Sequence, residues 1–235
     1  MIFFDIIYQE HMEKCVLPCE ICIHIANYTP AAFNVFRRLC WQLNIALSGD
    51  VAAARVRFIV RKRISTGRFI HNFSVNPHGE YEGVYEIIDK EAALVTERRN
   101  YINGVYHGNY WWHDTNDYGW IDCNYNMGKI HGEFKQRLFR VEEGWVLITA
   151  NYVNDMIHGK HTVELYKCGG LIKIDNYVNG VKTGVCKKYY GDARQLLKST
   201  AYYLNGEKHG EKIYYDMEQQ QTKIEYYHHG KLIVD

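Results

Sequence analysis

Tyr101-Ile102-Asn103-Gly104-Val105-Tyr106-His107-Gly108 is the first of six copies of one short phrase. The first tyrosines of successive copies are 24, 27, 25, 26 and 24 residues apart. A fixed period in the twenties is typical of a repeat protein whose units stack on one another. The later copies occupy residues 125–132, 152–159, 177–184, 203–210 and, in shortened form, 227–230.

Each unit is predicted to form two antiparallel strands. A run rich in aromatic and aliphatic residues follows the phrase, and a polar or glycine-bearing break separates it from a second run that leads into the next copy. In the second run of one unit, Ile172 and Ile174 alternate with Lys173 and Asp175. Such a period of two is typical of a half-buried strand.

The glycines and asparagines of the phrase predict tight turns. Asn-Gly pairs supply the positive φ that two-residue reversals between twisted strands demand. One copy has Asn154-Asp155 instead, and aspartate is among the few other residues that adopt this conformation. The second glycine of each copy is predicted to relieve the backbone where the next strand starts. The predicted turn residues are Asn103, Gly104, Gly108, Gly128, Gly132, Gly159, Asn179, Gly180, Gly184, Asn205, Gly206 and Gly210.

Stacking these hairpins predicts an elongated antiparallel sheet. Strands lie about 4.8 Å apart, so six units of two strands would extend for about 60 Å. Such a sheet has two faces and no deep interior. Tyrosines suit it, because they cover apolar surface while keeping a hydroxyl group in water, and the chain holds 20 of them.

The pattern Tyr-x-Asn-Gly-x-x-His-Gly followed by an aromatic strand resembles the MORN repeat family. It is closest to the variant with longer units that occurs in bacterial antitoxin-like proteins and large DNA viruses. The resemblance covers about residues 76–235, with a degenerate seventh copy at Asn76, His78, Gly79 and Gly83. It implies a repeat sheet but no single activity, because family members are scaffolds, membrane-associated proteins or uncharacterised.

The residues before the repeats have a different composition. Up to Val75 there are 9 Lys and Arg against 5 Asp and Glu, a net charge of +4, whereas the remainder carries 19 against 22, or −3. Thr29-Pro30 is typical of a helix start, and an apolar face continues over 31–47. A further helix is predicted from Asp50 to about Arg63. The predicted fold is therefore α+β, with a helical module over 1–70 and repeats over 71–235.

A second resemblance lies in this helical module. Leu-Pro-x-Glu-Ile-x-x-x-Ile over 17–25, with a turn at 28–30 and an amphipathic helix ending near Cys40-Trp41, looks like an F-box. The F-box docks onto the Skp1 subunit of a cullin ubiquitin ligase, and the combination with MORN-variant repeats is similar to proteins of giant viruses of amoebae. At 44–46 the chain departs from the basic turn common in that family. The resemblance implies partner contacts by Leu17, Pro18, Ile21 and Ile25.

Cysteine and histidine spacings favour structural roles over metal binding. Cys19 and Cys22 have the spacing of one zinc knuckle, but Cys40 has no second partner at such a spacing. Equivalent histidines recur in four units, which is typical of a turn element; units about 10 Å apart are too distant to share a metal ion. No metal and no cofactor are predicted. The recurring histidines are His107, His131, His158 and His209.

The strongest charge feature is a basic patch with no acidic residue between Asp50 and Glu80. It suits an anionic membrane or nucleic acid phosphates. The net charge of only +1 favours pairing within the molecule or plain solvation, and no specific nucleic acid is predicted. The patch comprises Arg55, Arg57, Arg61, Lys62, Arg63 and Arg68.

Three functional hypotheses follow, and none is enzymatic, because no nucleophile or nucleotide-binding motif is present. In the first, the head recruits a ubiquitin ligase and the sheet binds its substrate. In the second, the protein is a scaffold of a virion or membrane assembly and the head caps the sheet. In the third, the array is an antitoxin-like neutraliser. Seven unevenly placed cysteines, no apolar run of 18 residues and no secretory signal predict a soluble intracellular protein, in the host cytoplasm or a virion if viral. The hairpin at 223–235 offers an edge for self-association.

Overall fold

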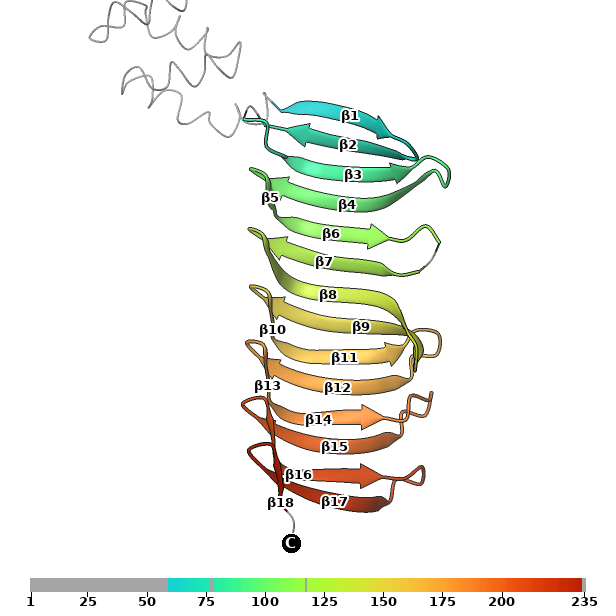
Figure 1. Cartoon of the computed structure of the whole chain (residues 1–235), viewed down its shortest axis with the longest axis vertical. Coiled ribbons are helices and arrows are strands. Elements are labelled where there is room, and N and C mark those ends of the chain that lie inside the picture. The colour runs from blue at the N-terminus through green and yellow to red at the C-terminus, as the bar shows by residue number, and fades with distance from the viewer. Residues whose placement is uncertain (1–58, 77, 117, 234–235) are drawn as a thin grey trace, which may run out of the picture. The chain divides into compact units, whose positions relative to one another are not determined.

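The computed structural model describes residues 59–76, 78–116 and 118–233, and all regular structure in this part of the chain is β-strand (Figure 1). None of these residues forms a helix long and apolar enough to cross a membrane. The strands are β1 (Val60–Thr66), β2 (Phe69–Val75), β3 (Gly83–Asp89), β4 (Leu94–Ile102), β5 (Val105–Tyr106), β6 (Gly108–His113), β7 (Trp120–Asn126), β8 (Lys129–Arg140), β9 (Gly144–Val153), β10 (Met156–Ile157), β11 (Gly159–Leu165), β12 (Leu171–Val178), β13 (Val181–Lys182), β14 (Gly184–Tyr189), β15 (Leu197–Leu204), β16 (Glu207–Tyr215), β17 (Gln221–His228) and β18 (Lys231–Ile233).

The first strand begins earlier than the predicted boundary near residue 70. β1 takes in the last residues of the helix predicted over 50–63, so the end of that helix is wrong; its remainder lies outside the described residues. β-branched side chains such as Val60 and Ile64 favour extended backbone. Gly67, with a φ of 50°, then lets the chain reverse into β2.

The described residues fall into two units. The first holds residues 59–62 and 73–82, where Val75 bridges to Tyr81 and Phe73 meets the Tyr81 ring edge-on at 5.3 Å. The second holds residues 63–72 and 83–233 and contains the repeats.

The second unit, which holds the repeats, folds as a meander in which each strand pairs antiparallel with its sequence neighbours. Figure 1 shows these strands stacked in chain order, with short turns along one edge and longer loops along the other. We call these the turn edge and the loop edge. The predicted antiparallel hairpin repeat is therefore confirmed.

The turns at the turn edge have the backbone conformation that the sequence predicts. Both central residues of each two-residue turn have positive φ, for example 47° at Asn179 and 80° at Gly180. Asp155 takes this conformation at 69°, and its Oδ1 accepts a hydrogen bond from the Ile130 N–H at 2.7 Å. The other predicted glycines, Gly108, Gly132, Gly159, Gly184 and Gly210, also have positive φ, between 68° and 88°.

Successive turns are hydrogen-bonded to one another. The N–H of the second turn residue donates to a carbonyl two residues beyond the preceding turn, at N–O distances of 2.8–2.9 Å. Five consecutive units are linked in this way to the unit before them. The bonds run from Gly128 to Tyr106, Asp155 to Ile130, Gly180 to Ile157, Gly206 to Lys182 and Gly230 to Lys208.

The second glycine of each phrase lies directly opposite the tyrosine of the next unit. Gly83 continues this series, so it occupies the position expected for the degenerate seventh copy. A Cβ atom on Gly132, Gly159 or Gly210 would meet nothing within 4 Å, so positive φ rather than crowding favours glycine there. The pairs are Gly83–Tyr101, Gly108–Tyr125, Gly132–Tyr152, Gly159–Tyr177, Gly184–Tyr203 and Gly210–Tyr227.

We expect Gly180→Val to lower the free energy of unfolding by about 1–3 kcal/mol, the usual cost of holding a side chain in a disfavoured backbone region. A Cβ atom at this position meets only Met156, at 3.8 Å, so the cost comes from the backbone and not from a clash. Urea denaturation followed by circular dichroism measures it. The matched variant Gly180→Asn should lose clearly less, because asparagine adopts positive φ more readily. Equal losses in the two variants would contradict this account.

Candidate functional site

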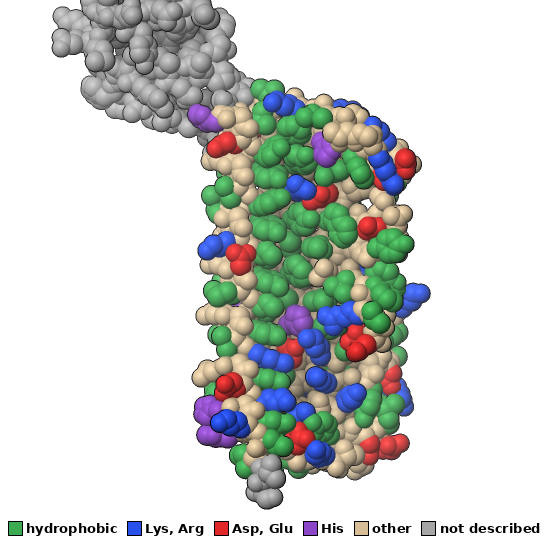
Figure 2. All heavy atoms as spheres, in the orientation of Figure 1, with side chains coloured by type: hydrophobic (Ala, Val, Ile, Leu, Met, Phe, Trp, Pro, Cys, Tyr) green, Lys and Arg blue, Asp and Glu red, His purple; other side chains and the backbone are tan. Residues whose placement is uncertain are grey.

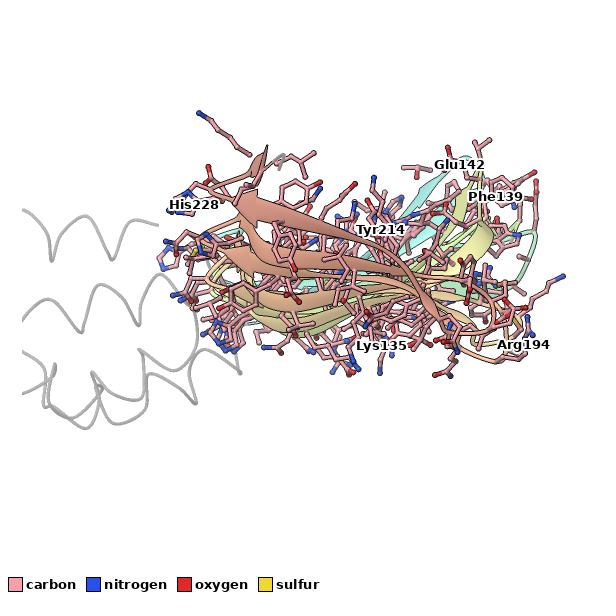
Figure 3. All side chains as sticks on the ribbon, turned by 90° about the horizontal axis from the view of Figure 1, so that it is seen from below. Lys135, Phe139, Glu142, Arg194, Tyr214 and His228 are labelled. Carbon is pink, nitrogen blue, oxygen red and sulfur yellow. The ribbon has the colours of Figure 1, made fainter. Side chains whose placement is uncertain are left out.

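The repeat tyrosines lie on one face of the sheet, which we call the tyrosine face. Side chains two residues apart on a strand, or directly opposite on its neighbour, share a face. Figure 3 shows side chains leaving both faces of the ribbon, with Tyr214 of the tyrosine face and Lys135 on opposite sides. In the second unit, every buried apolar side chain among the described residues lies on the tyrosine face. They are Tyr101, Cys123, Val146, Ile148, Ala150, Val163 and Cys186.

The tightest packing on this face lies in the middle of the array. Val146 and Val163 are fully buried and pack with Ile148, Leu138 and Leu165 of neighbouring strands. The burial of a few aliphatic side chains per unit agrees with the expectation of a sheet without a deep interior. The remaining stability comes from strand pairing and from aromatic contacts along the face.

A recurring stacking position lies two residues after each turn. At three of these positions the side chain lies against the ring of the tyrosine in the next unit. Tyr106 lies between Tyr101, at a ring-centre distance of 4.8 Å, and Tyr125, at 5.1 Å. The stacking positions are Tyr106, Ile130, Ile157, Lys182 and Lys208, so their character changes from aromatic through aliphatic to cationic along the array.

The first units form an aromatic half of the tyrosine face. Burial raises the pKa of Tyr101 to about 12 and also raises the pKa of Tyr110. Glu97 accepts a hydrogen bond from Arg99 at 2.6 Å, and the Arg99 guanidinium lies 5.4 Å from the Tyr85 ring centre. Tyr101 is buried and Tyr110 half-buried, and both phenols are neutral groups that form hydrogen bonds.

The last units form a lysine half, defined by six lysines. At the stacking positions, Lys182 Nζ lies 4.2 Å from the Tyr203 ring centre and Lys208 Nζ lies 4.6 Å from that of Tyr227. Figure 2 shows apolar side chains over the earlier strands and basic ones over the later strands. The six are Lys173, Lys182, Lys188, Lys208, Lys212 and Lys223.

Two carboxylates partly neutralise the lysine half. Asp175 is buried and pairs with Lys173 at 3.2 Å and Lys182 at 2.7 Å. Burial opposes ionisation of Asp175, but the bonds and positive charges of Lys182 and Lys173 together outweigh burial and lower the carboxyl pKa below its ordinary value. The lysines still outnumber the acids, so this half of the face keeps a positive potential.

Glu225 is the second of these carboxylates. It pairs with Lys223 at 2.7 Å and accepts hydrogen bonds from the hydroxyls of Tyr214 and Tyr227 at 2.9 Å. The bond to Lys223, followed by those from Tyr227 and Tyr214, lowers the pKa of Glu225 to about 2. The ionised carboxylate thus ties together two adjacent strands, β16 and β17.

The recurring histidines lie at the turn edge. Nδ1 of His107 lies 3.5 Å from the backbone N of Met127, and Nδ1 of His158 lies 3.5 Å from that of Asn179. Each of these histidines therefore faces the first residue of the next turn.

Few of the other predicted site residues are brought together. Leu17, Pro18, Ile21, Ile25, Arg55 and Arg57 lie outside the described residues. Arg61, Lys62 and Arg63 are exposed on β1, not on a helix. Arg68 Nε donates to the fully buried Asp89 at 2.7 Å, which is the intramolecular pairing that the sequence favoured for this patch.

The described cysteines have no activated thiol on the tyrosine face. Burial raises the pKa of the Cys123 thiol to about 11 and also raises that of Cys186. Thiolate is the nucleophilic form of cysteine, so both side chains serve as small apolar residues. Cys168 is exposed in a loop.

Sequence reasoning missed two periodic features. An asparagine precedes the repeat tyrosine in four units, and the side-chain amides of Asn100 and Asn176 donate to the carbonyls of Asn109 and Val185 at 2.6 Å. The cations at the stacking positions are the second. Both recur with the repeat period, so aligning the copies residue by residue would have shown them.

Neither a protein-family model nor a curated protein matches this sequence.

We expect Glu225→Gln to lower stability at neutral pH but not near pH 2. Because the folded-state pKa is below the ordinary value, the carboxylate stabilises the fold above about pH 4.5 and loses this contribution as pH falls toward 2. Denaturant unfolding of both proteins across this range should show a difference that vanishes in acid. The exposed Glu142→Gln is the matched control and should stay close to wild type throughout; a pH-independent loss in Glu225→Gln would contradict the assignment.

Proposed function

We propose that this protein is a non-enzymatic interaction protein whose tyrosine face binds a macromolecular partner. The observation that carries the proposal is a stripe of half-buried aromatic side chains along one face of the repeat sheet. Tyrosine is enriched at protein interfaces because it offers both apolar area and a hydroxyl group. Strands on a rigid scaffold hold these rings in fixed positions, which reduces the entropy lost on binding.

The proposed role of the N-terminal residues is to recruit a Skp1-type subunit, with the sheet choosing the substrate. The F-box-like pattern at 17–25 supports this role. In such an adaptor, the docking segment and the substrate surface lie on different parts of the chain. A change on one should then leave the other intact.

We expect the full-length protein to retain purified Skp1 in a pulldown, and Leu17→Asp and Ile21→Asp to abolish retention, because a charge on an apolar docking surface opposes its burial. Circular dichroism checks that the variants remain folded. Lys188→Glu, on the sheet, is the matched control and should retain Skp1. A folded wild-type protein that does not retain Skp1 would contradict the adaptor and favour a scaffold.

A membrane-associated scaffold is the second candidate, and the lysine half of the tyrosine face favours it. Basic clusters bind anionic lipid at about 1 kcal/mol per lysine near the surface. Lys188 is exposed on this face, opposite Lys173, whereas its neighbour Lys187 is exposed on the other face, opposite Ile174. The two residues form a matched pair of equal charge.

In flotation with phosphatidylserine vesicles at low salt, we expect a scaffold of this kind to bind, and Lys188→Glu to weaken binding more than Lys187→Glu. Salt should release the protein, since exposed charges are screened within about 10 Å at 0.1 M. Equal effects of the two substitutions would show that the tyrosine face is not the lipid-binding surface. Absence of flotation would remove this candidate.

A further inference from the structure

Three histidines meet where the last turn stacks on the unit before it. Ring-centre distances are 5.2 Å from His209 to His228, 5.2 Å from His209 to His229 and 4.5 Å from His228 to His229. One nitrogen of each ring lies within 4.8 Å of the other two. Figure 3 places His228 at the edge of the sheet opposite the loop that carries Arg194.

The hydrogen bonds between successive turns, which we call the turn ladder, explain how these residues come together. His209 occupies the recurring histidine position, which faces the first residue of the next turn. The bond from Gly230 N–H to the Lys208 carbonyl, at 2.9 Å, seats the last turn against this position. The first residue of that turn is His229, with a φ of 45°. Equivalent histidines of different units are too far apart to share a metal ion, but these three occupy different positions of the repeat and lie at one turn.

The ring Nδ1 of His209 differs in its surroundings from that of the equivalent residues His107 and His158. Nδ1 of His107 and of His158 faces the backbone N of the following turn. Nδ1 of His209 is buried and has no hydrogen-bond partner among the residues that the structure describes. A buried acceptor or donor without a partner is costly, so a ligand at this nitrogen would remove that cost.

We propose that His209, His228 and His229 form a binding site for a divalent transition metal ion of the zinc type. Imidazole nitrogen suits zinc, copper and nickel ions, and three protein ligands plus one water is a common zinc arrangement. Zinc–nitrogen bonds of about 2.0–2.1 Å need the three nitrogens closer together than 4.8 Å. His228 and His229 are exposed, so their rings are free to rotate toward His209.

Glu207 supports the same assignment. Its Oε2 lies 3.6 Å from Nδ1 of His229. A carboxylate beside a metal-binding histidine orients the ring and raises its basicity. The bound ion would fasten β16 to the hairpin of β17 and β18, where the two strands pair over only three residues.

Isothermal titration of the full-length protein with zinc chloride at pH 7.5 tests the site. We expect His229→Asn and His209→Gln each to lose one equivalent of bound zinc, or to bind it more than about 100-fold more weakly. Loss of a residue that only supports a metal ligand typically weakens binding by about 10–100-fold, so a larger loss indicates a direct ligand. Asparagine occupies the same turn position at 179 and 205 with positive φ, so His229→Asn preserves the turn. His158→Gln is the matched control and should keep the wild-type stoichiometry.

Hydrogen exchange gives a second readout that cysteine sites elsewhere in the chain would not produce. Zinc should slow amide exchange in β17 and β18 of the wild type but not of His229→Asn. Lowering the pH to 5.5 should weaken binding, because metal ligation requires neutral imidazoles. Equal zinc stoichiometry in wild type, His209→Gln and His229→Asn, or no protection of β17 and β18, would overturn the proposal.

Discussion

The two-residue turn with positive φ at both central positions is the constraint on which the rest of the sheet depends. It sets the register of each hairpin, and the N–H of its second residue is hydrogen-bonded to the preceding unit. The phrase is consequently fixed in length at the turn edge. Variation in the repeat period, from 24 to 27 residues, is taken up at the loop edge, where no such ladder links successive units among the described residues.

The pairing of glycine with tyrosine across neighbouring units follows from that register. Each phrase-ending glycine has positive φ and lies directly opposite the tyrosine of the next unit, which places the repeat tyrosines on one face of the sheet. The aromatic ring then becomes available to the stacking position beside it. One backbone requirement therefore arranges the tyrosine face over the whole array, while the residues at the stacking positions determine its local chemistry.

Local features of the sequence predicted most of the repeat sheet, because turn chemistry and alternation act over a few residues. Asn103, Gly180 and Asp155 have the conformations that their residue types indicate. The helix predicted over 50–63 was wrong at its C-terminal end, because the basic stretch before Gly67 forms a strand. Contacts between units were harder to predict. The meeting of Lys182 with Tyr203, or of His209 with His229, depends on the offset at which one hairpin stacks on the next.

The turn ladder has a further consequence for how such an array changes during evolution. Each unit presents a carbonyl acceptor to the unit after it and an N–H donor to the unit before it, so the two sides of any unit are complementary to those of every other. Duplication or loss of one whole unit would leave compatible neighbours on both sides of the junction, and no shared core would have to be repacked. The length of the tyrosine face is thus a heritable variable that can change in steps of one hairpin, independently of what precedes or follows the repeats.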